Sequence, residues 1–229
     1  MLRENIERVK NRVSLACLRA GRDVLSVEII VVTKGRSLED IKEAVHCGLS
    51  AIGENRVQEA LLKYAKKDFC ARWHMIGHLQ KNKVKDAIGI FDLIQSVNSL
   101  KLCEEINVQA ARIGKVQDVF LEIKTSPEDS KSGFLPGDTL ESLRIIAGLA
   151  NLKVLGLMTI PPWSSSGPEG SRAYFKRLFS LREEIRASGI LNRELKLSMG
   201  MSDDFEVAIE EGADMVRIGR AIFEGGRYA

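Results

Sequence analysis

The chain has 229 residues, of which 45% are hydrophobic and 28% charged, a composition that suits an α/β domain with a sizeable core. Its formal net charge of +3 at pH 7 does not indicate binding to nucleic acid or to an acidic membrane surface. No apolar run approaches the roughly 18 residues that a membrane span needs, and residues 1–12 lack the apolar core of a signal peptide. We therefore expect a cytoplasmic protein whose residues 1–229 form one domain.

The chain opens with a helical pattern and continues with short β-rich runs that alternate with longer amphipathic segments. In the opening helix, Ile6, Val9, Val13 and Cys17 recur at helical spacing, and Gly21 is a suitable stop. The predicted strands are Glu28–Thr33, Ser50–Gly53, Trp73–Gly77, Leu93–Ser96, Gln117–Ile123, Lys153–Leu157, Glu194–Leu197 and Met215–Ile218. The predicted helices between them include Leu38–Cys47, Arg56–Lys66, Leu100–Arg112, Thr139–Leu149, Ser171–Ala187 and Asp203–Glu211.

Eight strand–helix units in order predict an α/β fold, a single (β/α)8 TIM-type barrel with an extra N-terminal helix. An open doubly wound sheet is the alternative, and it would be favoured by a G-x-G-x-x-G segment after the first strand. Lys34–Arg36 stands there instead. Gly48 and Gly212 should end their preceding helices in the left-handed conformation. The loop-like stretch Pro161–Gly170 is placed to form a flap after the sixth strand.

Lys34 comes directly after the first predicted strand. In barrels of this type the active groups lie at the carboxyl ends of the strands. An apolar strand that delivers a lysine into the barrel mouth should desolvate its ammonium group, and the neutral amine attacks an aldehyde. The alternative is a surface lysine that begins the next loop, and position alone favours that alternative.

Two loops near the C-terminus have the composition of a phosphate site: Leu197–Asp204 and Val216–Ala221. The loops after strands seven and eight commonly hold a phosphate against backbone N–H groups. Ser198 offers a hydroxyl group, Gly200 and Gly219 permit close approach, and Arg220 adds positive charge. An amine facing a phosphate site across a barrel suggests a phosphorylated aldehyde cofactor. Capping of the following helix is an alternative role for three neighbouring polar residues, and we prefer it for the two aspartates: Ser202, Asp203 and Asp204.

Seven segments together resemble the pyridoxal phosphate homeostasis proteins, a family related in fold to the N-terminal barrel of alanine racemase. The resemblance covers nearly the whole chain, and the order of the segments makes it specific. These segments are Val32–Lys34, Gly53–Glu59, Trp73–Lys83, Lys131–Phe134, Gly156–Thr159, Leu197–Asp204 and Val216–Gly219.

The resemblance implies that the chain binds pyridoxal 5′-phosphate (PLP) as a Schiff base on Lys34. It places Asn55 near the cofactor hydroxyl group and His78 at the mouth of strand three. It also implies that Met199 packs near the pyridine ring and that Arg217 faces the ring nitrogen. The residues that would hold the phosphate are Ser198, Gly219 and, through its backbone, Arg220.

The role of the cofactor depends on the arginine at the ring nitrogen. A permanently charged guanidinium keeps that nitrogen unprotonated, which makes PLP a poorer electron sink. A racemase also needs an acid–base group on each face of its substrate, and none of the chain's tyrosines is an evident second base: Tyr64, Tyr174 and Tyr228. The first hypothesis is a carrier that releases PLP to PLP-dependent apoenzymes and takes part in PLP (vitamin B6) and amino-acid homeostasis. The alternatives are a small PLP-dependent amino-acid racemase-like enzyme and a barrel with an unrelated phosphorylated ligand.

A metal site is not expected. His74 and His78 lie four residues apart on a predicted strand, about 13 Å along it, which is too far to chelate one ion. The cysteines are widely spaced and form no C-x-x-C pair: Cys17, Cys47, Cys70 and Cys103.

Overall fold

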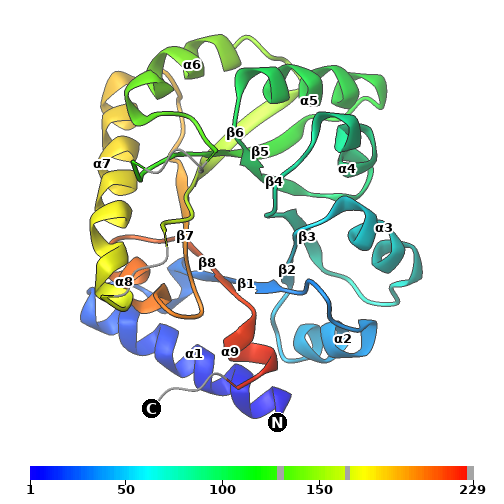
Figure 1. Cartoon of the computed structure of the whole chain (residues 1–229), viewed down its shortest axis with the longest axis vertical. Coiled ribbons are helices and arrows are strands. Elements are labelled where there is room, and N and C mark those ends of the chain that lie inside the picture. The colour runs from blue at the N-terminus through cyan, green and yellow to red at the C-terminus, as the bar shows by residue number, and fades with distance from the viewer. Residues whose placement is uncertain (128–131, 163–165, 226–229) are drawn as a thin grey trace.

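The computed structural model describes residues 1–127, 132–162 and 166–225. Eight parallel strands pair in sequence order, and the last pairs with the first to close a barrel (Figure 1). The predicted (β/α)8 barrel is therefore confirmed. The strands are β1 (Glu28–Val32), β2 (Ala51–Glu54), β3 (Arg72–Met75), β4 (Leu93–Val97), β5 (Gln117–Glu122), β6 (Leu152–Met158), β7 (Lys196–Met201) and β8 (Met215–Ile218).

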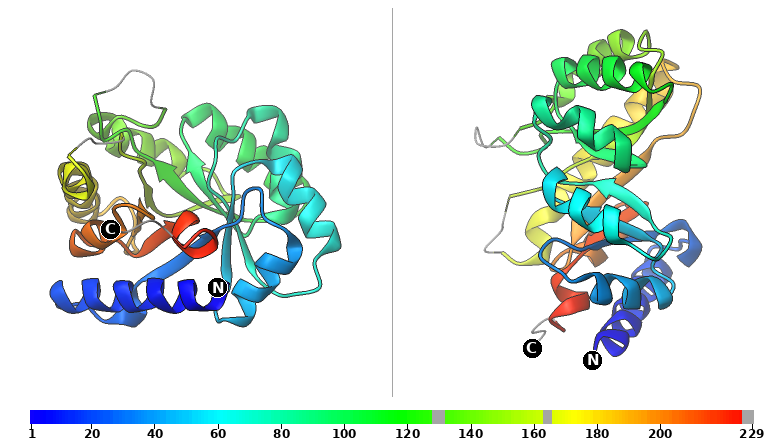
Figure 2. Two further views of the ribbon diagram at one scale, coloured as in Figure 1. Left: turned by 60° about the horizontal axis from the view of Figure 1, so that its bottom comes forward. Right: turned by 90° about the vertical axis from the view of Figure 1, so that its right-hand side faces the viewer.

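Helices surround the barrel, and the extra N-terminal helix packs against α8 and α9 (Figure 2). The helices are α1 (Leu2–Arg19), α2 (Leu38–His46), α3 (Val57–Lys66), α4 (Val84–Ile90), α5 (Leu100–Arg112), α6 (Thr139–Ile146), α7 (Arg172–Ser188), α8 (Phe205–Glu210) and α9 (Arg220–Phe223). Short 3-10 helices complete the described elements: η1 (Val24–Ser26), η2 (Lys81–Lys83), η3 (Pro136–Asp138) and η4 (Pro168–Ser171).

Local sequence signals account for several helix ends. Ser37 and Asp40 form a capping box that begins α2, so two backbone donors of its first turn are satisfied by side chains. Gly48 and Gly212 have φ of +87° and +93°, which confirms the predicted left-handed caps. Glycine adopts this conformation without a steric penalty.

Strand seven differs from its predicted bounds. It runs to Met201 instead of ending at Leu197, because Ser198 is in register with Met158 of β6 and Met215 of β8. Ser198 and its neighbours therefore lie in the barrel wall, and the prediction that they form a loop is wrong. The predicted flap includes residues 163–165, which lie outside the described residues.

The apolar core has two layers. A small cluster fills the barrel interior: Ile30, Ala51, Leu93, Phe120, Met158 and Met215. A larger cluster packs the outer face of the strands against the helices. Among the polar side chains buried on the strands, four are joined by hydrogen bonds: His74, Gln95, Ser198 and Arg217. These polar groups indicate that the barrel interior has a role beyond apolar packing.

Two further expectations concern the whole chain, namely the absence of a membrane-spanning segment and the presence of one domain. No helix in the described ranges is long and apolar enough to cross a membrane. That residues 1–229 form one PLP-binding domain stays a prediction.

Gly156 tests how tightly the barrel wall is packed. An added Cβ would lie 2.3 Å from the Lys196 carbonyl oxygen and 2.7 Å from the Phe120 ring, so we expect Gly156→Ala to lower the free energy of unfolding by about 1–3 kcal/mol. The matched control is Gly89→Ala in α4, where an added Cβ meets nothing within 4 Å and should stabilise the helix by about 0.5–1 kcal/mol. Urea denaturation measures both, and equal stability of the parent and Gly156→Ala would contradict the packing.

Candidate functional site

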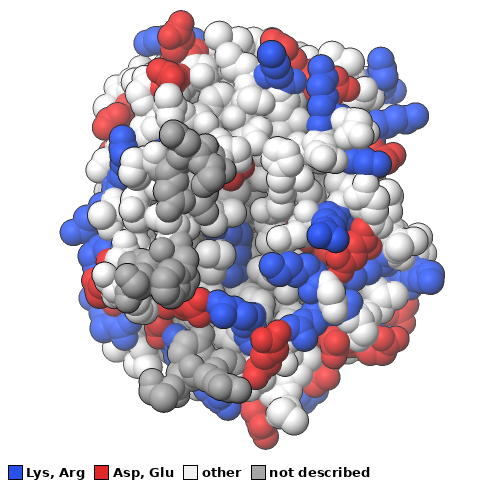
Figure 3. Space-filling model, in the orientation of Figure 1, with Lys and Arg blue, Asp and Glu red and all other residues white. Residues whose placement is uncertain are grey.

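Several of the predicted site residues converge at the carboxyl end of the barrel. Lys34, Asn55, His78 and Gly219 follow β1, β2, β3 and β8, which are neighbours in the sheet. Figure 3 shows Lys and Arg side chains gathered on this face over the ends of β1 to β3. Lys34 itself is exposed. The prediction that the chain desolvates its ammonium group is therefore wrong, and any burial of this amine has to come from a ligand.

The backbone on both sides of Lys34 is held by helix α3. Lys63 Nζ donates to the Thr33 carbonyl oxygen at 2.7 Å, and Gly35 N–H donates to Glu59 Oε1 at 2.6 Å. The peptides before and after Lys34 are thus tied to one helix, while the lysine side chain is left exposed. We call these two contacts the α3 clamp.

The clamp is built on a buried ion-pair cluster. Lys63 Nζ lies 2.7 Å from Glu54 Oε1 and 2.7 Å from Glu59 Oε1, and Thr33 Oγ1 donates to Glu54 Oε1 at 2.6 Å. Burial raises the pKa of the Glu54 carboxyl group, whose other oxygen has no partner among the described residues. Sequence reasoning gave Glu54 no role. The available signal was Glu59 and Lys63 at helical i,i+4 spacing.

Arg217 places a buried positive charge inside the barrel. It is 3% exposed, donates to Ser198 Oγ at 2.7 Å and donates to the Thr159 carbonyl oxygen at 2.8 Å. Burial lowers the pKa of Arg217 to about 10, so the guanidinium group remains charged at neutral pH. Two acceptors offset part of its desolvation cost.

From Ser198, further hydrogen bonds lead across the barrel interior to a neutral histidine. Ser198 Oγ donates to Gln95 Oε1 at 2.6 Å, and Gln95 Nε2 lies 2.9 Å from His74 Nδ1. Because the amide can only donate there, His74 Nδ1 accepts and its proton sits on Nε2. Burial lowers the pKa of His74 to about 3. We call His74, Gln95, Ser198 and Arg217 the interior network.

The three predicted site residues of β7 serve packing and this network. The Ser198 hydroxyl already contacts Arg217 and Gln95 and is 0% exposed, so we withdraw it as a phosphate ligand. Met199 is fully buried in the outer cluster between strand and helices, so we withdraw the prediction that it packs near the pyridine ring. Gly200 has φ of +89°, and an added Cβ would lie 2.5 Å from Ala208 Cβ. Helix α8 packs so close to this position that only glycine fits there.

Backbone donors remain at the start of α9. Within the described ranges, the N–H groups of Gly219 and Arg220 have no carbonyl partner, and Ala221 N–H donates to Ser202 Oγ at 3.3 Å. An added Cβ on Gly219 would lie 3.2 Å from Val32 Cβ, which explains glycine there. Open N–H groups at a helix start suit an oxyanion.

The charged groups beside α9 form an ion pair. Arg220 pairs with Asp203, and both side chains are exposed. Asp204 precedes α8, but its carboxylate accepts from Met201 N–H at 2.8 Å and does not cap that helix. The capping interpretation is therefore wrong for the Asp204 side chain, although its position as N-cap residue is confirmed.

A pocket of about 320 Å³ opens beside Asn55 and His78. Asn55 Oδ1 is buried and has no partner in the described part of the chain, which leaves a free acceptor at the end of β2. His78 is exposed, and its Nδ1 lies 3.5 Å from Asn98 Nδ2. An orphaned buried acceptor fits a ligand that brings a hydroxyl or amine donor.

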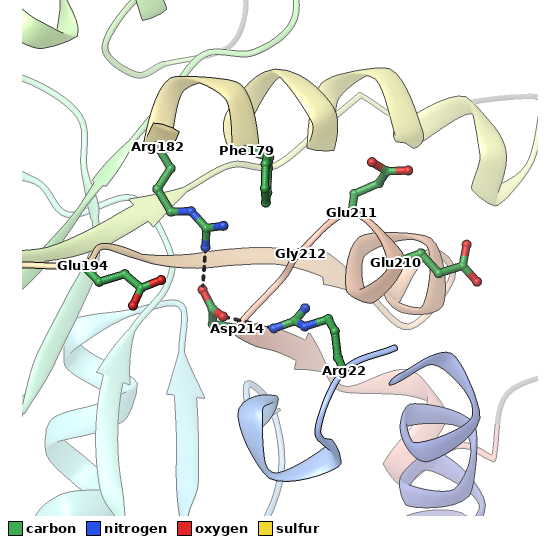
Figure 4. Close-up of a pocket in the computed structure, with 8 residues that line it drawn as sticks. All are labelled: Arg22, Phe179, Arg182, Glu194, Glu210, Glu211, Gly212 and Asp214. Atoms are coloured by element: carbon green, nitrogen blue, oxygen red, sulfur yellow. Dashed lines mark hydrogen bonds and ion pairs between the residues drawn. The ribbon is translucent and has the colours of Figure 1, made fainter. Parts of the chain in front are cut away.

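A second hollow lies at the amino end of the barrel (Figure 4). Its Arg22 and Arg182 side chains both pair with Asp214, and Arg182 also pairs with Glu183, so both guanidinium groups already have carboxylate partners. The described residues contain no group of three or more His, Cys, Asp or Glu side chains that could hold a metal ion. The chemistry that the geometry offers is therefore concentrated at the carboxyl end.

Comparison with known proteins places this site in a family. Residues 2–226 match the model of the alanine racemase N-terminal domain. A pyridoxal phosphate homeostasis protein of Aquifex aeolicus is 45% identical over 98% of this chain and 98% of its own length. The chain belongs to the pyridoxal phosphate homeostasis family.

Solved structures agree with the family. PipY of Synechococcus elongatus, solved with PLP bound, has a TM-score of 0.83 and 32% identity over 97% of this chain and 100% of its own. An alanine racemase of Clostridium difficile has a TM-score of 0.77 at 17% identity, over 99% of this chain and 56% of its own. The second likeness concerns the fold alone. The family resemblance inferred from the sequence is therefore confirmed.

The interior network predicts an acid-dependent loss of stability. An unfolded histidine has a pKa of 6.5, while the pKa of folded His74 is about 3. The contribution of neutral His74 to the free energy of unfolding is therefore fully present above pH 6.5 and is lost as the pH falls towards 3. Relative to His74→Gln, which keeps an acceptor for Gln95, the parent should lose about 1 kcal/mol between pH 6 and pH 5. Urea denaturation at each pH measures this difference.

The matched control is His78→Gln, because His78 is exposed. Its unfolding free energy should keep the parent's pH dependence. If the unfolding free energy of the parent depends on pH in the same way as that of His74→Gln, burial does not hold His74 neutral.

Proposed function

We propose that this chain binds PLP as a Schiff base on Lys34 and acts as a cytoplasmic carrier in PLP and amino-acid homeostasis, without efficient catalysis. The observation that carries the proposal is an exposed amine on a turn whose flanking peptides are fixed by the α3 clamp. The PLP bound to PipY and the names of the curated relatives support it. When bound, PLP supplies an aldehyde, with which the Lys34 amine forms an imine bond and releases water.

The described residues fit PLP at two further points. Asn55 Oδ1 is a buried acceptor without a partner, which suits the hydroxyl group of the cofactor. The open N–H groups of Gly219 and Arg220 suit a phosphate at the start of α9. His78 lies at the rim beside Asn55, where both residues line one pocket. These assignments replace the Ser198 hydroxyl with backbone donors.

Two observations support the carrier role, the buried charge of Arg217 and the position of Tyr64. We propose that Arg217 faces the pyridine nitrogen, where a charged guanidinium keeps the nitrogen unprotonated and weakens PLP as an electron sink. Tyr64 is held in a ring contact with Trp73, with ring centroids 5.3 Å apart, so it is not placed as a second acid–base group. A carrier of this kind would hold the aldehyde and release it to PLP-dependent apoenzymes.

Removing the amine tests the attachment. We expect Lys34→Ala to lose the visible absorbance band of the Schiff base after PLP is added, because no amine stands on the clamped turn. Lys42→Ala removes another lysine, a partly exposed residue of α2 that pairs with Asp68, and should retain the band. Equal bands in the parent and in Lys34→Ala would overturn the assignment.

Hydrogen exchange in amino acids tests the carrier against the racemase-like enzyme. The PLP-loaded parent should exchange the α-hydrogen of alanine or serine with heavy water no faster than free PLP does, because an unprotonated ring nitrogen stabilises a carbanion poorly. Proton NMR of the amino acid follows the loss of the α-hydrogen signal. Rapid exchange that depends on Lys34 would favour the enzyme and contradict the carrier.

A further inference from the structure

The pocket beside Asn55 extends well beyond the proposed cofactor contacts. It reaches from the first turn of α3 to the segment that leads into α4, and its volume is about 320 Å³. Asn55 contributes a buried oxygen at the end of β2, and the exposed His78 lies beside it at the rim. The residues that line the rest are Arg56, Val57, Gln58, Gln80 and Lys83.

The outer part of this pocket carries the positive charges of Arg56 and Lys83, of which the Arg56 charge also acts, together with Lys63, to lower the pKa of the Glu59 carboxyl group. Within the described ranges, neither Arg56 nor Lys83 takes part in a salt bridge. Lys83 is half-buried, and Arg56 is exposed. The hollow at the amino end of the barrel is different, because its Arg22 and Arg182 both pair with Asp214.

Helix α3 adds backbone donors to the same place. Its N-cap residue, Arg56, makes no side-chain cap bond, and the N–H groups of Val57 and Gln58 have no carbonyl partner in the described part of the chain. The helix is 10 residues long, so its dipole also favours a negative charge at this end. Two cations and two open N–H groups form a donor set for a carboxylate or phosphate.

The inner part of the pocket favours a cationic hydrogen-bond donor instead of an anion. Asn55 Oδ1 is a buried oxygen that has no partner among the described residues, and an amide oxygen has two lone pairs. One lone pair can accept from the cofactor hydroxyl group and the other from an ammonium group. An inorganic phosphate supplies no comparable cationic donor. A ligand with a carboxylate at one end and an ammonium group at the other satisfies both ends of the pocket.

We propose that this pocket binds a free α-amino acid beside the cofactor site. Its carboxylate lies between Arg56, Lys83 and the start of α3, and its ammonium group lies at Asn55. The end of β2 neighbours the end of β1, so the guest's nitrogen points towards the turn of Lys34. This inference deepens the proposed function and rests on it for the identity of the ligand at Lys34.

The test measures binding without any reaction. The full-length chain is loaded with PLP and treated with borohydride, so the guest's amine cannot exchange with Lys34. L-alanine is then titrated while the backbone amide signals are followed by NMR. We expect the signals of Val57 and Gln58 to shift, and we expect Arg56→Gln and Lys83→Gln each to weaken binding by about tenfold. Lys85→Gln is the matched control, because Lys85 is exposed on α4 and does not line the pocket.

Three further titrations identify the ligand. Ethylamine, which lacks the carboxylate, and acetate, which lacks the amine, should each bind more weakly than L-alanine. Inorganic phosphate should shift these amides less than L-alanine does. The inference is overturned if phosphate binds here more tightly, or if Lys83→Gln binds L-alanine as well as Lys85→Gln does.

The same titration on the chain without PLP separates the two proposals. If PLP does not attach to Lys34, the proposed function fails, while the L-alanine titration still reports on the pocket. If PLP attaches and L-alanine does not bind, the amino-acid site fails and the proposed function stands.

Discussion

The buried charge of Arg217 is the constraint around which the barrel interior is arranged. Removing a guanidinium group from water costs several kcal/mol unless hydrogen-bond acceptors replace the lost hydration. Ser198 Oγ and the Thr159 carbonyl oxygen are those acceptors. Ser198 in turn donates to Gln95, whose amide meets a neutral His74. Each polar group therefore fixes the donor or acceptor role of the next, and protonation of His74 would remove the acceptor at the end of the chain. The interior below the proposed cofactor is a set of interdependent hydrogen bonds.

The region around Lys34 follows a different principle. Its backbone is fixed by the α3 clamp, whereas its amine is exposed to water. Formation and hydrolysis of an imine both involve water, so an exposed amine on a fixed turn suits a cofactor that is taken up and released. A buried amine would suit an enzyme that retains its cofactor through many reaction cycles. The contrast between the fixed interior and the exposed lysine is the physical basis of the carrier proposal.

The sequence predicted the architecture well because the strand–helix alternation is periodic and local. It also predicted the caps at Gly48 and Gly212, since each glycine follows an amphipathic helix. Ser198 and Met199 were misplaced because the end of β7 depends on pairing with β6 and β8, which no local pattern reveals. Glu54 and Lys63 were missed for a similar reason: their contact with Thr33 joins a strand, a helix and a loop. Gln95 did carry a signal, as a polar residue within an apolar strand, but its partners Ser198 and His74 lie on other strands.

The attachment of PLP to one lysine is the central claim, and peptide mapping tests it most directly. The parent chain is incubated with PLP, reduced with borohydride, digested and analysed by mass spectrometry, with every lysine competing for the aldehyde. The account predicts that the peptide containing Lys34 carries the cofactor mass as the dominant product. A dominant product on any other lysine, or labelling spread evenly over exposed lysines, would contradict it.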